Sequence, residues 1–330
     1  MSLLEAHDLN VWFDLPHEGT LHAVQGVSFG VDAGERLGLV GESGCGKTTA
    51  LLALMGLLPP NAQVSGRVTV NGEDILAGGE DAMRSHRWTD VAMVFQGAMN
   101  ALNPVKTVGS QIVEPMRFHD TADGDAAQRQ AGELLELVGL PASAAKRFPH
   151  EFSGGMRQRA AIAMALACSP KVLLADEPTT ALDVMVQAQI LDLLESLTRD
   201  LGLALILVTH DLPLVTQVCE RAVVMYAGRI AEFGSVDTLF HDPRHPYTRL
   251  LFEATPDLSG LEEVVSIPGS PPRLDRPTVG CPFAPRCDRV FEPCAAHLPA
   301  LVSVAERHRA ACHLNDEAYA RPPRPTETPA

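Results

Sequence analysis

The chain has 330 residues, about twice the length of a typical domain, so we expect one large domain with a smaller second unit. Hydrophobic residues make up 46% of the chain and charged residues 20%, a composition that excludes global disorder. Lysine and arginine number 26 against 41 aspartates and glutamates. The resulting formal net charge of −15 makes the chain a poor candidate for general nucleic-acid binding, which needs a basic surface.

We expect neither a secretory signal nor a membrane span. The N-terminus reads MSLLEAHDLN and has no basic flank before an apolar run. The longest uncharged stretch, residues 48–66, contains two prolines, and its apolar part is far shorter than the roughly 20 residues that cross a bilayer. We therefore expect a protein that stays in the cytoplasm and meets a membrane only through a partner.

A glycine-rich loop follows the first buried strand. The apolar run 37–40 ends at Gly41, and Gly-x-x-x-x-Gly-Lys-Thr leads from there into a helical pattern at Thr48. The glycines permit a ring of inward-facing backbone N–H groups for a polyphosphate. Lys47 would place a cation on the β- and γ-phosphates, and Thr48 would offer a hydroxyl to Mg²⁺. This loop predicts a nucleoside triphosphate site and leaves kinases, small GTPases and transport ATPases open.

A second anion-binding element is predicted before the helical pattern 156–167. Residues 151–160 read EFSGGMRQRA, so the Ser153 hydroxyl and the backbone of Gly154 and Gly155 would lie at a helix N-terminus. One chain thus carries two phosphate-binding elements but one loop lysine, which favours a nucleotide held between two subunits. The alternative is that this segment is only a cap and a turn.

Two further buried strands are predicted at 172–175 and 204–208. Asp176 and Glu177 follow the first of them, at the edge where α/β sheets place ligand sites. Asp176 could hold Mg²⁺ through water, and Glu177 could polarise an attacking water molecule. The second strand ends at Thr209-His210-Asp211, and the apolar periodicity of 187–201 predicts an amphipathic helix packed on the sheet.

Composition changes near residue 250. The last 80 residues hold 13 of the 25 prolines and four of the seven cysteines, Cys281, Cys287, Cys294 and Cys312. We expect residues 266–277 to form an extended connector and the final RPPRPTETPA to form a mobile tail. Four thiolates suit either Zn²⁺ or an iron–sulfur cluster, although no Cys-x₂-Cys knuckle is present; free buried thiols are the third possibility.

Together these motifs resemble the ATP-binding subunit of an ABC transporter from residue 1 to about 315. GESGCGKT matches Walker A, MVFQ the Q-loop, FSGGMRQR the signature, LLADEP Walker B, ALD the D-loop and His210 the switch histidine. The resemblance implies that Gln96 reaches Mg²⁺ and the water, and that His210 contacts the γ-phosphate. It also implies an aromatic side chain stacked on adenine: Phe13 is the best-aligned candidate and Trp12 its competitor, unless both simply pack in the first sheet.

The site residues that the resemblance implies fall into four groups. The catalytic group is Glu177, His210, Lys47 and Gln96. The ATP-binding group is Phe13, Gly41, Glu42, Ser43, Gly44, Cys45, Gly46, Lys47, Thr48, Thr49 and Gln96. The group facing a partner's ATP is Ser153, Gly154, Gly155 and Met156, with Asp183 in the D-loop. The Mg²⁺ group is Thr48, Gln96 and Asp176.

Cys45 stands where many relatives have serine, and a nearby helix N-terminus lowers a thiol pKa. We therefore expect a reactive Cys45 thiol that ATP protects from a maleimide.

A narrower resemblance, to the longer ATPase subunit of dipeptide/oligopeptide importers, rests on DEPTTALDV, VMYAGRIAEFG, HPYTRLL and SIPGSPP…GCPFAPRC. It implies an α/β P-loop NTPase core with an antiparallel β edge and a helical signature subdomain at about 97–165. The nucleotide-binding domain would span 1–250, a Pro/Cys-rich extension 251–320 and a tail 321–330. The four terminal cysteines would then hold a [4Fe–4S] cluster, with zinc as the alternative.

The same resemblance implies the partners. They are a second, homologous ABC ATPase in a heterodimer, two transmembrane permeases and an extracytoplasmic peptide-binding protein, with this chain peripheral on the cytoplasmic face. Import of nickel or another small solute is an alternative. A soluble ABC ATPase is a third alternative. Translation factors of that kind carry two tandem cassettes, whereas this chain has one set of motifs, and only 105 residues separate Lys47 from Ser153. That spacing leaves no room for the long coiled coil of DNA-repair relatives.

Overall fold

The computed structural model describes residues 2–16, 19–97, 101–254, 266–275 and 278–319. Its strands are β1 (Ser2–Leu15), β2 (Gly19–Asp32), β3 (Arg36–Val40), β4 (Ala62–Val70), β5 (Glu73–Asp74), β6 (Val91–Val94), β7 (Val172–Asp176), β8 (Ala204–Val208), β9 (Arg221–Tyr226), β10 (Arg229–Ser235), β11 (Val302–Ala305) and β12 (His308–Ala310). Its α-helices are α1 (Lys47–Leu54), α2 (Gly79–His86), α3 (Val108–Phe118), α4 (Gly124–Leu137), α5 (Gly154–Ala165), α6 (Val184–Leu201), α7 (Leu212–Val218), α8 (Val236–His241), α9 (Pro246–Glu253) and α10 (Glu292–Ala296). The predicted tail at 321–330 lies outside the described residues.

The main sheet has the order β11-β12-β10-β9-β3-β8-β7-β6, and its strands from β9 to β6 run parallel. These strands are short apolar runs buried on both faces, as parallel strands covered by helices require. Along β7, Leu173 packs toward α5 and α6, whereas Leu174 packs toward α1 and the second sheet. The strands predicted at 172–175 and 204–208 are confirmed as β7 and β8.

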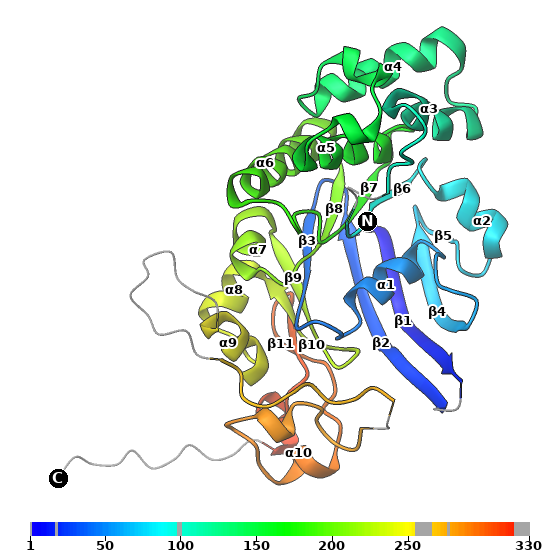
Figure 1. The fold of residues 1–330 in the computed structure, drawn as a ribbon. Helices are drawn as coiled ribbons and strands as arrows, with labels where there is room; N and C mark the ends of the chain where they lie inside the picture. Colours follow the sequence, from blue (N-terminus) through cyan, green and yellow to red (C-terminus); the bar gives the residue numbers. More distant parts are fainter. Residues whose placement is uncertain (1, 17–18, 98–100, 255–265, 276–277, 320–330) are drawn as a thin grey trace.

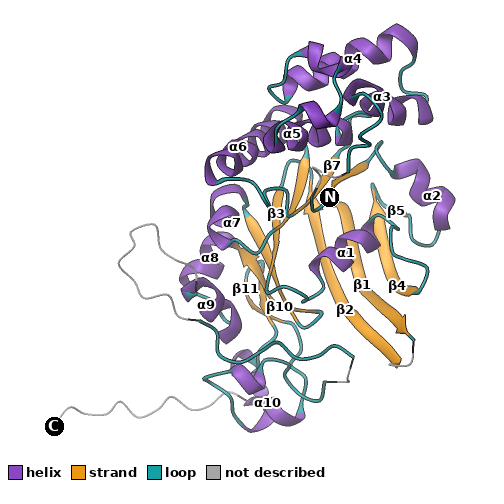
Figure 2. Ribbon diagram, in the orientation of Figure 1, coloured by secondary structure: helices purple, strands orange, loops and turns teal. Residues whose placement is uncertain are grey.

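The second sheet is antiparallel, in the order β2-β1-β4-β5 (Figure 2). Two long strands, β1 and β2, pair along most of their length, and α1 lies between this sheet and the main one. Asn71 and Gly72 connect β4 to β5 with positive φ angles of 51° and 84°, which a tight hairpin turn of this kind needs. The predicted antiparallel β edge is therefore confirmed.

Helices α3, α4 and α5 form a cap at one end of the molecule, above the ends of β6, β7 and β8 (Figure 1). The helix predicted from 187 begins three residues earlier, at Val184, because Asp183 caps it by accepting a hydrogen bond from the Val186 N–H at 3.0 Å. It buries Ile190, Leu193 and Leu194, but Leu201 is half exposed. Among the described residues, no helix is long and apolar enough to cross a membrane.

The C-terminal segment joins the main sheet. β12 pairs with β10 in an antiparallel register that sets Glu232 opposite Ala310, and β11 pairs with β12. The fully buried Glu232 carboxylate accepts hydrogen bonds from the His308 ring at 2.7 Å and from the Arg244 and His245 N–H groups at 2.6 and 2.9 Å. The extension thus shares a sheet and a buried polar network with the core.

Candidate nucleotide-binding and hydrolysis site

The glycine-rich loop between β3 and α1 is shaped by close backbone approach. Gly41 has a φ of 144°, and a Cβ there would lie 2.2 Å from the Met225 carbonyl oxygen. At Gly46, with a φ of 104°, a Cβ would lie 2.5 Å from the Ala23 carbonyl oxygen. Both positions therefore need glycine, because an L side chain meets backbone as well as an unfavourable φ. The loop wraps around the N-terminus of α1, where Lys47 and Thr48 begin the helix.

Lys47 and Thr48 point in different directions from the first turn of α1. The buried Lys47 ammonium donates to the carbonyl oxygens of Gly41 at 2.7 Å and Glu42 at 3.0 Å, which holds it within the loop. The Thr48 hydroxyl donates to Asp176 Oδ1 at 3.2 Å. Residues 128 positions apart in the chain thus meet, as the sequence predicts for a Mg²⁺ site.

Asp176 is almost fully buried at the end of β7. Burial raises the pKa of its carboxyl above the ordinary value, although the Thr48 hydrogen bond opposes the change. A hydroxyl and a carboxylate oxygen side by side are hard ligands that fit Mg²⁺, which usually takes one or two protein oxygens together with phosphate and water.

Glu177 is the centre of a hydrogen-bonded group. The Gln96 amide donates to Oε2 at 2.8 Å, the Thr180 hydroxyl to the same oxygen at 3.0 Å, and the His210 ring lies 3.1 Å from Oε1. Burial alone would raise the pKa of Glu177, but the hydrogen bonds from His210 and Thr180 outweigh it and lower that pKa. Glu177 also has a positive φ of 44°, a strained conformation for this residue type at a functional position.

Lys47, Thr48, Gln96 and Glu177 border one cavity of about 390 Å³, whereas Asp176, Thr180 and His210 are not among the described residues that line it. Its lining combines the loop with side chains from both sheets and from the C-terminal segment: Phe13, Leu21, Ala23, Ser43, Gly44, Gly46, Lys47, Thr48, Thr49, Gln96, Glu177 and Leu274. Phe13 faces the cavity, whereas Trp12 stacks on His22 at 4.6 Å. Among the described residues, Phe13 is the aromatic side chain that lines this cavity.

Comparison with known proteins identifies the family of this site. Residues 24–180 match the ABC transporter family, and residues 231–294 match the oligopeptide/dipeptide transporter C-terminal region. The dipeptide transport ATP-binding protein DppD of Bacillus subtilis is 44% identical over 321 residues, 96% of this chain and 95% of DppD. The oligopeptide transport ATP-binding protein OppD of Escherichia coli is 46% identical over 301 residues, 90% of this chain and 89% of OppD.

The chain belongs to the ABC transporter family. Among solved structures it resembles the dimeric ATP-binding cassette MJ0796 bound to ADP and Pi, with a TM-score of 0.63 and 28% identity over 71% of this chain and 98% of that one. The predicted ABC ATPase fold is confirmed. The chain is therefore an ATP-hydrolysing member of this family.

The ABC signature lies apart from the cavity. Ser153 caps α5, its hydroxyl accepting a hydrogen bond from the Met156 N–H at 3.3 Å. None of the described residues from Ser153 to Met156 lines the cavity around Lys47. Asp183, in the ABC D-loop, caps α6. The signature therefore lies at the N-terminus of α5, outside the cavity that Lys47 lines.

The expectation of a reactive Cys45 is wrong. The thiol is buried, and burial raises its pKa, although the nearby Lys47 ammonium opposes the change. Cys45 Sγ lies 3.7 Å from Lys47 Nζ, on the inner side of the loop. Desolvation, which raises the pKa of the Cys45 thiol, thus outweighs the helix N-terminus, which was expected to lower it.

The four cysteines of the extension come near one another but do not assemble a metal site. Burial raises the pKa of Cys281 to about 11 and that of Cys312 to about 12, and the other thiols add to both shifts. Among the described residues, no three His, Cys, Asp or Glu side chains form a group that could hold a metal ion. The described arrangement therefore gives no support to the predicted [4Fe–4S] cluster or to its zinc alternative.

Three residues that sequence reasoning missed also border the site, all of them C-terminal. The Tyr247 hydroxyl accepts a hydrogen bond from the Glu42 N–H at 2.9 Å, and Arg286 pairs with the Glu42 carboxylate. Leu274 lines the cavity, and its carbonyl oxygen accepts from the His22 N–H at 3.4 Å. The motifs HPYTRLL and GCPFAPRC and the connector marked these segments, but nothing in their residue types indicated a contact with the phosphate loop.

Proposed function

We propose that this chain hydrolyses ATP to drive import of di- or oligopeptides, as one ATPase subunit of a multisubunit transporter on the cytoplasmic face of the cell membrane. The observation that carries the ATPase chemistry is the group in which Gln96, Thr180 and His210 surround the Glu177 carboxylate beside the Lys47 loop. The peptide cargo rests on the relatives, which are named for dipeptide and oligopeptide transport.

The arrangement supports a division of labour in hydrolysis. Loop N–H groups and Lys47 would bind the β- and γ-phosphates, while Phe13 would stack on the base. Thr48, Asp176 and Gln96 would hold Mg²⁺, which when bound neutralises charge on the phosphates. Glu177, kept ionised by its lowered pKa, would polarise the attacking water.

His210 and Lys47 would stabilise the charge that develops on the γ-phosphate. His210 lies two residues beyond the end of β8, and its ring is 3.1 Å from Glu177 Oε1. Preorganised donors of this kind stabilise the transition state because they need no rearrangement when the charge forms.

A composite site across two subunits follows from the separated signature. Ser153, Gly154, Gly155 and Met156 would face the ATP of a partner, with Asp183 at the junction. The dimeric cassette MJ0796 supports a paired arrangement. We propose that the partner is a second, homologous ABC ATPase and that two permeases and an extracytoplasmic binding protein complete the transporter.

The proposed domains are 1–250 for nucleotide binding, with the helical subdomain at about 97–165, and 251–320 for the extension. The family match at residues 231–294 and the pairing of β12 with β10 support an extension that is built onto the core.

We keep the predicted [4Fe–4S] cluster only as a hypothesis, because no group of metal ligands is found among the described residues. Measuring the iron and acid-labile sulfide content of anaerobically purified protein tests whether the cluster is present. Four irons per chain that disappear in Cys287→Ser would restore the cluster. If the four thiols of the extension react with a thiol reagent and the protein contains neither iron nor zinc, both the cluster and the zinc alternative are rejected.

The transport proposal is tested by affinity purification of the chain from its native membrane fraction. Two polytopic membrane proteins and a second ABC ATPase should copurify, and a deletion strain should lose uptake of labelled di- or tripeptides. Normal peptide uptake combined with lost nickel uptake would favour the alternative cargo. Copurification with soluble factors alone would favour the non-transport ATPase.

A further inference from the structure

We propose that the C-terminal extension positions the phosphate-binding loop through Arg286, which forms a bidentate ion pair with Glu42, the residue after Gly41. This inference rests on the proposed ATPase function and names a residue for it that lies 244 positions from its partner. Arg286 Nη1 donates to Glu42 Oε2 at 2.6 Å, and Nη2 donates to Oε1 at 2.8 Å. Two parallel bonds of this kind fix the orientation of both groups, which a single contact does not.

The Arg286 guanidinium is held from every side. Its Nε donates to the Pro268 carbonyl oxygen at 2.7 Å, Nη1 also donates to the Tyr226 hydroxyl at 3.1 Å, and Nη2 reaches the Ile267 carbonyl oxygen at 3.5 Å. All five N–H groups therefore have an acceptor. The hydrogen bond to Glu42 is the main reason that the Arg286 pKa rises above its ordinary value.

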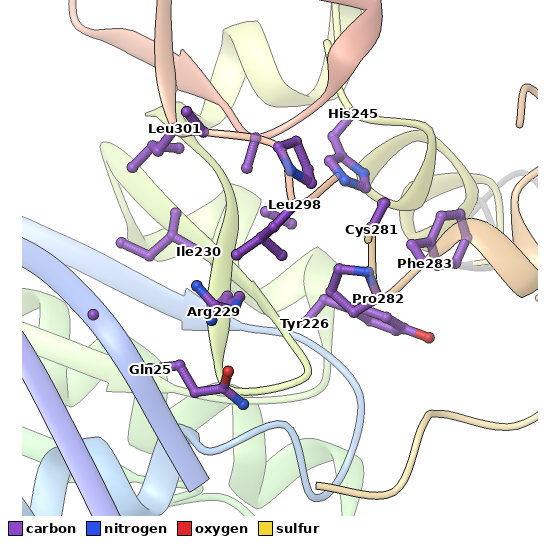
Figure 3. A pocket seen from close by; sticks show the side chains of 15 residues that line it. Gln25, Tyr226, Arg229, Ile230, His245, Cys281, Pro282, Phe283, Leu298 and Leu301 are labelled. Carbon is purple, nitrogen blue, oxygen red and sulfur yellow. The ribbon is translucent and has the colours of Figure 1, made fainter. Parts of the chain in front are cut away.

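The Arg286 guanidinium packs against two aromatic rings. Its guanidinium lies 5.8 Å from the ring centres of both Tyr226 and Phe283, and these two rings meet edge to face at 5.2 Å. Figure 3 shows Tyr226 and Phe283 close together, with Cys281 nearby, around a cavity of about 360 Å³ between core and extension. Arg286 is itself buried, with 7% of its surface exposed. A guanidinium in such a setting holds its partner in one place.

Glu42 connects Arg286 to Lys47, because it contacts both side chains. Its N–H donates to the Tyr247 hydroxyl at 2.9 Å, its carboxylate is held by Arg286, and its carbonyl oxygen accepts from Lys47 Nζ at 3.0 Å. One residue thus connects the extension and α9 to the ammonium that would bind phosphate. Arg286 is a positioning residue, because it touches the loop and not the nucleotide.

The test measures Mg·ATP affinity by equilibrium binding to the full chain and steady-state ATPase activity in the assembled transporter. Arg286→Met should weaken Mg·ATP binding by about tenfold, the effect of losing one charge-assisted interaction. Arg286→Lys should recover only part of the loss, since an ammonium cannot form the two parallel bonds. The ATPase assay should show a raised KM for ATP with a smaller change in kcat.

Arg249→Met is the matched control. Arg249 also joins the core to the extension, through Asp288 at 2.5 Å, but it makes no described contact with the phosphate loop. Its loss should leave Mg·ATP affinity within about twofold of wild type. An equal loss in both variants would show that general loosening of the extension is responsible, and would overturn the proposal.

A double-mutant cycle separates action through Glu42 from packing alone. In the Glu42→Gln background, Arg286→Met should cause little further loss of affinity, because the link is already broken. An additive loss, or wild-type affinity in Arg286→Met, contradicts the inference. Wild-type and Lys47→Ala proteins calibrate the assay: if both bind alike, the proposed nucleotide site itself fails, which is a distinct outcome.

Discussion

At the scale of single residues, the two adjacent carboxyls of the site are tuned in opposite directions. Asp176 is buried with one hydroxyl donor, and its pKa is raised. Glu177 receives bonds from three side chains, and its pKa is lowered. Adjacent groups with divergent environments support different roles, a metal ligand and an ionised base.

Glu177→Gln should bind Mg·ATP with nearly wild-type affinity but hydrolyse it at least about a hundredfold more slowly, because the amide cannot polarise water. ATP turnover by the assembled transporter and the fraction of closed complex in the presence of ATP measure this. Rapid turnover by the variant would remove Glu177 from its role. Glu195→Gln, on the far part of α6, is the control and should leave turnover unchanged.

Asp176→Asn should stabilise the empty protein while abolishing Mg²⁺-dependent hydrolysis. A raised carboxyl pKa means that the folded state binds the proton more tightly than the unfolded state, so stability falls as pH rises from the unfolded pKa of about 3.9 through the folded one. Above that window the variant should gain on the order of 1 kcal/mol in unfolding free energy.

Urea unfolding of both proteins at several pH values measures this gain, and the difference should shrink toward acid. Asp192→Asn is the control, because Asp192 is exposed on α6. An Asp176→Asn protein less stable than wild type at neutral pH would contradict the reasoning from burial.

At the scale of elements, the join between β10 and β12 depends on a buried carboxylate. Glu232→Ala would leave the Arg244 and His245 N–H groups and the His308 ring without their acceptor in the interior. We expect a loss of about 3 kcal/mol in unfolding free energy. Glu114→Ala, which removes only an exposed ion pair to Lys106, should change it by less than about 0.5 kcal/mol. Equal denaturant midpoints for the two variants would refute the role of Glu232.

The elements that carry local signals could be predicted from the sequence. Short apolar runs predicted β7 and β8, and glycine spacing predicted the phosphate loop, because each signal lies within a few residues. The family resemblance also predicted that Thr48 lies near Asp176 and Gln96 near Glu177, because the fold of the family determines which strand ends are neighbours. Both pairs are hydrogen-bonded in the structure.

The pairing of β12 with β10 and the grip of Arg286 on Glu42 could not be predicted in this way. Both join segments far apart in the chain, and neither strand composition nor an arginine among prolines specifies a distant partner. The chemistry of Cys45 was misjudged for a related reason: the sequence shows the helix N-terminus beside it but not the burial that decides its pKa.

At the scale of the whole molecule, the separation of signature and phosphate loop predicts that each can be disabled independently. Ser153→Ala should leave Mg·ATP binding by the isolated chain unchanged, yet lower ATPase activity of the assembled transporter by roughly tenfold or more. Ser235→Ala removes a comparable helix cap, at α8, and should affect neither. Full activity of an isolated Ser153→Ala chain would exclude a site shared between subunits.

The seating of β12 against β10 has a practical consequence for shortened versions of the protein. A fragment that stops before residue 300 would leave the outer backbone of β10 bare, around Glu232 and Phe233, where the two strands now exchange bonds. An uncovered strand of this kind recruits other chains edge to edge. Truncated chains that end with the nucleotide-binding domain should therefore aggregate. The extension thus also protects the protein from self-association through the edge of β10.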